Sequence, residues 1–143
     1  MGVIYRGGMN EPRTVSLPVG GAYTPGSAVV IGATGLTQAT APTGRWGVLA
    51  NRDFYGQDEL TAYASGDTGV AYEIEPLQQY KWQVAAATYT YGQELTIGAS
   101  GRLVAAASSN IVVAFFTDEV KAGVAQSAGA LCDVTIANFY TKP

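Results

Sequence analysis

The stretch that decides the fold is Tyr23-Thr24-Pro25-Gly26-Ser27-Ala28-Val29-Val30-Ile31-Gly32-Ala33-Thr34-Gly35. It recurs 66 residues later as Tyr89-Thr90-Tyr91-Gly92-Gln93-Glu94-Leu95-Thr96-Ile97-Gly98-Ala99-Ser100-Gly101, with seven of thirteen positions identical. In each copy an apolar run ends at a Gly-Ala-Thr/Ser-Gly sequence, and a further apolar run follows downstream. Glycine adopts positive φ without steric cost, so these sequences predict hairpin turns between strands. The repeat therefore predicts two related strand-turn-strand units, at about 23–50 and 89–116, that face one core.

Short apolar runs continue along the rest of the chain, and turn-forming residues separate them. Runs of four to six β-branched and aromatic residues at this spacing are typical of β-sandwiches and barrels. The predicted strands are 14–19, 28–31, 46–50, 70–74, 94–97, 103–105, 111–116 and 132–139. A chain of 143 residues has the length of one domain and can bury a core without disulfides. We therefore predict an all-β protein with little helix, whose single sandwich or barrel-like domain spans 23–143.

Two segments are open to more than one interpretation. Within 77–87, Leu77, Tyr80, Val84 and Ala87 have helical spacing, whereas Tyr80, Trp82 and Val84 alternate as in a strand. We favour the strand. Residues 118–122 are interpreted as one helical turn between strands.

Residues 1–22 are predicted to form an extended N-terminal arm. The segment 7–13 contains turn residues without apolar periodicity, and 14–19 alternates with period two. Pro18 lacks an N–H, which suits the edge of a sheet. Such an arm can fold back on its own domain or lie on a neighbouring subunit. Its candidate contact residues are Val15, Leu17, Pro18 and Val19.

The composition argues against several classes of partner. The net charge is −3 and the eight Lys and Arg are scattered, so nucleic-acid binding is not expected. The longest apolar run, 111–116, is too short to span a bilayer, so no membrane partner is expected. The first residues lack a signal-peptide pattern, which predicts synthesis in a cytoplasm without export. Charged residues make up only 13%, against about 25% in typical proteins, and such a Tyr-rich surface favours packing against neighbours.

The residues of common catalytic sites are missing or isolated. The sequence contains no histidine, which removes Ser-His-Asp triads, Cys-His pairs and His-based zinc sites. Cys132 is the only cysteine, and a small buried side chain is favoured there over a reactive thiol. Asp53, Asp58 and Glu59 lie close together but lack the spacing of a calcium loop, so a plain surface loop is favoured. We expect no enzymatic activity, no cofactor and no small-molecule substrate.

A family resemblance rests on the two copies of the repeated unit. The first copy has the glycine-led strand Pro25-Gly26-Ser27-Ala28-Val29-Val30, a hairpin and Gly47-Val48-Leu49-Ala50; the second has Tyr91-Gly92-Gln93-Glu94-Leu95-Thr96-Ile97 and Ile111-Val112-Val113-Ala114. This pattern resembles the small capsid decoration (cement, or head-stabilising) proteins of tailed bacteriophages. It covers about 23–140, and segments 51–60 and 77–87 depart from the simplest form. The resemblance implies a β-tulip type of domain on the outer surface of an icosahedral capsid in the virion. The domain would bind the major capsid protein, often as a trimer, without doing chemistry. The arm residues Val15, Leu17, Pro18 and Val19 would then contact the capsid or a second subunit.

The resulting hypothesis is that the protein stabilises a shell by mass action, because it binds only the assembled form. Many weak contacts repeated by symmetry would add up without one strong site. Two alternatives remain. One is a carbohydrate-binding adhesion module, because Trp46, Trp82 and the nine tyrosines offer rings that can stack on sugars. The other is a base component of a phage tail or head fibre.

Overall fold

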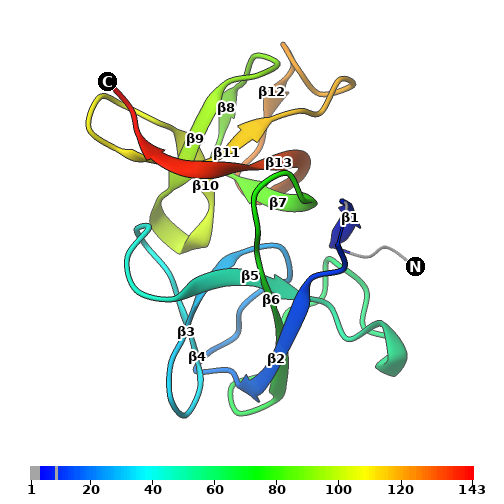
Figure 1. Ribbon diagram of the computed structural model, residues 1–143. Helices are drawn as coiled ribbons and strands as arrows, with labels where there is room; N and C mark the ends of the chain where they lie inside the picture. Colours follow the sequence, from blue (N-terminus) through cyan, green and yellow to red (C-terminus); the bar gives the residue numbers. More distant parts are fainter. Residues whose placement is uncertain (1–3, 9) are drawn as a thin grey trace.

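The first half of the chain forms one antiparallel sheet, which occupies the lower half of Figure 1. The structure is a computed structural model, and it describes residues 4–8 and 10–143. The five strands lie in the order β2 (Arg13–Pro18), β6 (Thr68–Glu73), β5 (Trp46–Ala50), β3 (Ala28–Ile31) and β4 (Leu36–Gln38). Beyond the end of β2, Val19 makes a parallel bridge to Leu36 at the start of β4. The sheet therefore curls until its two edges meet.

The second half forms a six-stranded sheet in the upper half of Figure 1. Its strands lie in the order β1 (Tyr5–Gly7), β7 (Gln79–Val84), β10 (Leu103–Ala105), β9 (Glu94–Ile97), β11 (Ile111–Phe116) and β13 (Ala130–Thr141). Strand β13 also pairs with β7, and β10 meets β7 in parallel at Leu103 and Val84. Strands β7, β10, β9, β11 and β13 therefore close into a ring. Strand β1 is not part of this ring and pairs with β7. Small elements complete the fold: β8 (Ala87–Thr88), β12 (Ala125–Gln126) and the 3-10 turns η1 (Asp53–Tyr55) and η2 (Ala99–Gly101).

The two sheets repeat one order of pairing. The strand order of the first sheet is β2, β6, β5, β3 and β4. The corresponding order in the second sheet is β7, β13, β11, β9 and β10. Strands β2 and β7 begin 66 residues apart, and so do β3 and β9. The Gly-Ala-Thr/Ser-Gly sequences join β3 to β4 and β9 to β10, so the hairpin interpretation is correct in both copies. Closing each sheet on itself removes most of its exposed edges, which otherwise invite aggregation.

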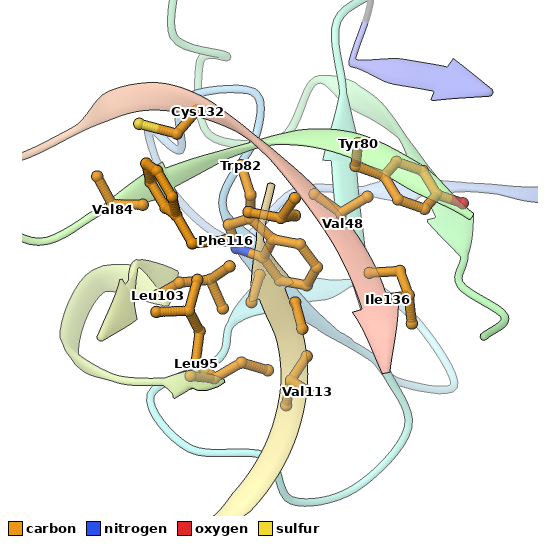
Figure 2. Close-up of a cluster of buried hydrophobic side chains, with 14 of the residues drawn as sticks. Val48, Tyr80, Trp82, Val84, Leu95, Leu103, Val113, Phe116, Cys132 and Ile136 are labelled. Atoms are coloured by element: carbon orange, nitrogen blue, oxygen red, sulfur yellow. The ribbon is translucent and has the colours of Figure 1, made fainter. Parts of the chain in front are cut away.

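The described residues form two main packed cores and a small third cluster of Ala106, Val112 and Ala137. The smaller of the two main cores fills the N-terminal sheet with residues such as Val29, Leu36 and Leu49, all fully buried. The larger core fills the C-terminal barrel and also includes Val48 of β5 from the N-terminal sheet. Figure 2 shows Val48 in this core together with Trp82. Its members from the C-terminal strands are Tyr80, Trp82, Val84, Leu95, Ile97, Leu103, Val113, Ala114, Phe116, Cys132, Val134 and Ile136. Because the larger core includes side chains from both sheets, the halves pack as one domain.

The all-β, single-domain prediction is confirmed, and both uncertain segments are now defined. Residues 79–84 form strand β7, which alternates between Tyr80 and Trp82 in the core and Lys81 toward the surface. Residues 118–122 are not assigned as a helix, but they contain one helix-like hydrogen bond in which the Ala122 N–H donates to the Asp118 carbonyl at 3.0 Å.

The N-terminal segment folds back on its own domain. Strand β2 pairs with β6 over its whole length, from Arg13 opposite Glu73 to Pro18 opposite Thr68. Strand β1 pairs with β7, and the Lys81 N–H donates to the Ile4 carbonyl at 2.8 Å. Of the predicted arm, residues 1–3 and 9 lie outside the described residues.

Candidate interaction surface

The four contact residues proposed on the arm divide between the core and the surface. Val19 is 2% exposed and belongs to the N-terminal core, while Val15 and Leu17 pack partly against that core. Pro18 is exposed at the end of β2. The structure thus brings three of the four side chains together on the inner face of their own sheet. That the arm contacts a capsid or a second subunit stays a prediction, and it now concerns mainly Pro18.

A different surface lies where two long loops line the same hollow. The segment 51–67, which joins β5 to β6, supplies one wall, and the segment 117–124, which joins β11 to β12, supplies the other. Between them lies a hollow of about 470 Å³, here called the loop groove. Its lining consists of Arg6, Glu59, Leu60, Lys81, Asp118, Val120, Lys121, Ala130, Leu131 and Asp133.

Exposed apolar side chains flank the loop groove. Leu60 is 75% exposed on one wall, and Val120 is 86% exposed on the other. Phe54 and Tyr55, on the same loop as Leu60, are 78% and 74% exposed, with their ring centroids 4.8 Å apart. Large apolar side chains that gather on a surface in this way mark interaction sites in soluble proteins. The loop groove is therefore the best candidate surface for a partner.

The charges of the loop groove are mostly paired within the chain. The Lys81 ammonium lies 2.9 Å from the Glu59 carboxylate, and the Arg6 guanidinium lies 3.4 Å from Asp133. The Lys121 ammonium donates to the Leu131 carbonyl. Since cations and anions cancel locally, the groove offers a partner an apolar rim on a nearly neutral floor.

Asp118 holds the wall that carries Val120. Its side chain is buried, and one carboxylate oxygen accepts the backbone N–H groups of Val120 and Lys121 at 3.2 and 3.0 Å. The other oxygen accepts the N–H of Asp133 in β13 at 3.1 Å. A carboxylate that binds backbone N–H groups in this way fixes a local turn. Val120 is consequently displayed on an ordered turn anchored to the barrel.

The opposite wall is ordered by polar contacts rather than by apolar burial. The Gln57 side chain accepts the Arg52 N–H at 2.7 Å and donates to the Thr61 carbonyl at 2.9 Å. The Asp58 carboxylate accepts the Leu60 N–H and the Thr61 hydroxyl, at 2.9 and 2.8 Å. The hydrogen bond from Thr61, followed by that from the Leu60 N–H, lowers the pKa of Asp58. Asp58 thus serves as a turn former, in line with the surface-loop interpretation of this segment.

Among residues 4–8 and 10–143, no cluster of three or more metal-ligating side chains is found. Glu59, one of the three acidic residues singled out in the sequence, pairs with Lys81 across the loop groove. No helix in the described part of the chain is long and apolar enough to cross a membrane.

Cys132 is fully buried in the larger core, with its side chain drawn in Figure 2. Burial raises the pKa of its thiol to about 11, so at pH 8 only about one thiol in a thousand would be ionised. Because the thiolate is the reactive form, we expect negligible alkylation by iodoacetamide at pH 8 in the folded protein and full alkylation in 8 M urea. Mass spectrometry after an hour of labelling checks this. Complete alkylation without urea would contradict the burial of Cys132.

The surface that the sequence did not reveal is carried by Leu60 and Val120. Each is a single apolar residue in a polar, acidic loop, Gln57-Asp58-Glu59-Leu60-Thr61 and Asp118-Glu119-Val120-Lys121. Neither of these segments contains another apolar residue that could bury this side chain. That isolation was the one sign in the sequence that Leu60 and Val120 are exposed. Their proximity depends on how the N-terminal sheet packs against the C-terminal barrel and cannot be read from the sequence.

Comparison with models of known protein families gives no match, and comparison with curated proteins finds no significantly similar sequence.

Proposed function

We propose that this protein is a non-catalytic decoration protein that binds the outer surface of an icosahedral phage capsid and stabilises it. The observation that carries the proposal is the loop groove, with exposed apolar side chains on a neutral, ordered floor. The family resemblance of the repeated strand-turn-strand units indicates the kind of partner. The partner is the major capsid protein, the location is the virion surface after synthesis in the host cytoplasm, and the oligomer favoured is a trimer.

The physical basis is apolar burial. Fully burying one Leu, Val or Phe side chain stabilises an interface by roughly 1.5–3 kcal/mol, before the cost of association is subtracted. Leu60 and Val120, which line the loop groove and are both exposed, supply such surface for a weak contact from each copy. Repetition over the shell then makes the total stabilisation large, since a ligand that binds only the assembled form shifts assembly by mass action.

The closure of the strand rings suits this role because it gives most strands a hydrogen-bonded neighbour on both sides. Each wall of the loop groove is anchored to a barrel strand by hydrogen bonds, as Asp118 is to Asp133 of β13. A preordered surface loses little conformational entropy when it binds. A shell that must resist internal pressure is therefore stabilised most by bound proteins that are already ordered before they bind.

Binding to undecorated shells tests the proposal, with ionic strength as the variable. Because the groove charges are paired internally, we expect saturable cosedimentation whose dissociation constant changes less than about threefold between 50 and 500 mM NaCl. Serum albumin serves as the control for trapping in the pellet. Absence of saturable binding by folded protein would contradict the proposal, and a loss of tenfold or more with salt would contradict apolar docking.

A carbohydrate-binding function is the second candidate, and the exposed Phe54–Tyr55 pair favours it. The Arg52 guanidinium lies 5.4 Å from the Tyr55 ring centroid and 4.7 Å from that of Tyr63, which steadies the segment. Aromatic faces held in this way can stack on sugar rings. A glycan array separates the two functions: hits that disappear in Phe54→Ala/Tyr55→Ala would favour adhesion over decoration.

A role at the base of a tail or head fibre is the remaining alternative from the sequence. It predicts the same apolar docking but a different location on the particle. Only the position of the protein on the virion distinguishes it from decoration of the shell.

A further inference from the structure

A second hollow, of about 190 Å³, lies where the two halves of the domain meet. Thr24, Ser27 and Gln38 come from the N-terminal half, and Gln83, Ser100 and Arg102 come from the C-terminal half. The side chains that line it are almost all polar, and none is acidic. It is separate from the loop groove, with which it shares no lining residue. This hollow is here called the junction pocket.

Arg102 is the only charged side chain of the junction pocket. Its side chain makes one hydrogen bond among the described residues, from Nε to the side-chain Oε1 of Gln83 at 3.4 Å, and no carboxylate in that part of the chain lies within ion-pair distance. A guanidinium carries five N–H donors in a planar fork. Four of these donors therefore have no partner within residues 4–8 and 10–143.

Gln83 holds the guanidinium in place. Its side chain is 5% exposed, and its amide nitrogen donates to the carbonyls of Pro25 and Thr24 at 3.0 and 3.3 Å. With both N–H groups used in this way, only the amide oxygen is left, and it faces Arg102. The cation is thus oriented by a buried group, as in sites that are preorganised for a ligand.

The internal repeat shows that the turn before Leu103 is one residue longer than its counterpart in the first copy. In the first copy Gly35 leads directly into Leu36 of β4, whereas in the second Arg102 stands between Gly101 and Leu103 of β10. Leu36 and Leu103 are both fully buried at the start of their strands, so they are the equivalent positions. Before these leucines, the Gly35 carbonyl accepts the Gly32 N–H at 2.9 Å, and the Arg102 carbonyl accepts the Gly98 N–H at 2.8 Å. Arg102 therefore stands where the first copy has a glycine, and the hairpin uses its backbone but not its side chain.

The turn before Arg102 has an uncommon backbone conformation beside the junction pocket. Ser100 has φ +58°, which is uncommon for a residue other than glycine, and its side chain lies on the pocket wall. Gly101 has φ +67°, and a Cβ there would stand 2.6 Å from the Gln38 amide nitrogen. Gln38 uses that nitrogen to donate to the Ala28 carbonyl at 2.8 Å, which leaves its second N–H available. Backbone strain of this kind concentrates at binding sites.

From these observations we infer that the junction pocket binds a small oxyanion, a phosphate or a carboxylate, through the Arg102 guanidinium. The Ser100 and Thr24 hydroxyls and the free Gln38 N–H are the additional donors. Arginine matches such anions because its fork donates two parallel hydrogen bonds. This inference does not rest on the proposed function, because the pocket is separate from the loop groove.

The test is a titration of ¹⁵N-labelled protein with sodium phosphate, and separately with sodium acetate, at an ionic strength held constant with NaCl. We expect saturable shifts of the Arg102 Nε–H, the Ser100 amide and the Gln38 side-chain amide, with a dissociation constant of roughly 1–10 mM for at least one anion. Preference for phosphate would indicate a free anion, and preference for acetate would indicate the carboxylate of a partner. Either preference supports an oxyanion site.

Arg102→Gln is expected to weaken the saturable shifts at least about tenfold, and Arg102→Lys to weaken them less, because Lys keeps the charge but loses the fork. Arg13→Gln is the matched control, since Arg13 is exposed on β2 and makes no ion pair among the described residues. It removes the same charge and should leave the titration unchanged. Linear, non-saturating shifts with both anions, or equal shifts in folded Arg102→Gln, would overturn the inference.

Discussion

Replacing Leu60 and Val120 together by Asp is expected to weaken binding to undecorated shells at least about 100-fold. Each substitution removes roughly 1.5 kcal/mol or more of apolar burial and places a charge in a dry contact. A total of about 3 kcal/mol corresponds to a factor of more than 100 in the dissociation constant. Both side chains are exposed in the free protein, so folding should be retained. Cosedimentation with shells over a range of protein concentrations measures the change.

The matched control for this variant is Leu77→Asp/Tyr91→Asp. Leu77 and Tyr91 are also large, apolar and exposed, at 71% and 59%, but neither lines the loop groove. The control adds the same two negative charges and should bind within about threefold of the unmodified protein. If both variants lose binding equally, the effect is one of net charge. If neither loses binding while both remain folded, the loop groove is not the docking surface.

Trp82→Ala is expected to have the largest effect on stability, lowering the free energy of unfolding by about 3–5 kcal/mol. Trp82 is fully buried in the core shared by the two halves, as Figure 2 shows. Its indole N–H also donates to the Gly101 carbonyl at 3.0 Å, which ties β7 to the turn before β10. Truncation would leave both a cavity and an unpaired buried carbonyl. Urea unfolding followed by circular dichroism measures the loss.

Trp82→Phe separates the two contributions. Phe retains most of the apolar volume but cannot donate to Gly101, so a smaller loss of about 1–2 kcal/mol is expected. Because small domains are stable by only about 5–15 kcal/mol, Trp82→Ala should lower the urea midpoint markedly. A loss below about 1 kcal/mol in Trp82→Ala would contradict the role of Trp82 as the centre of a shared core.

The strands were predictable from the sequence because their apolar residues alternate or cluster between glycine turns. The run Ile111–Phe116 is strand β11, and the turns after Ile31 and Ile97 are hairpins, as expected from their glycines. For 79–84, helical and strand spacings fit the sequence equally well. Pairing with β13 over six residues decided in favour of the strand. Local patterns thus define the elements, and tertiary pairing settles the ambiguous ones.

The candidate surface was not predictable, because it is made from residues far apart in the sequence. Leu60 comes from a loop of the N-terminal sheet and Val120 from a loop of the C-terminal barrel, and they line one groove because the two halves pack together, with Glu59 paired to Lys81 of β7. For the arm, the sequence showed the apolar pattern but not which surface the pattern packs against. The stripe of Val15, Leu17 and Val19 has the apolar alternation of a contact surface, and the same alternation serves a strand that packs on its own core. Period-two alternation identifies a buried face without identifying what buries it.

The most direct test of the central claim is a cryo-EM reconstruction of expanded, undecorated shells mixed with an excess of the protein. The proposed function predicts density for the two-barrel domain at symmetry-equivalent positions over the outer face of the shell. The loop groove, with Leu60 and Val120, should face the capsid subunits. Shells without added density would contradict the proposal that this is a decoration protein. Density confined to a tail or fibre vertex would contradict it equally.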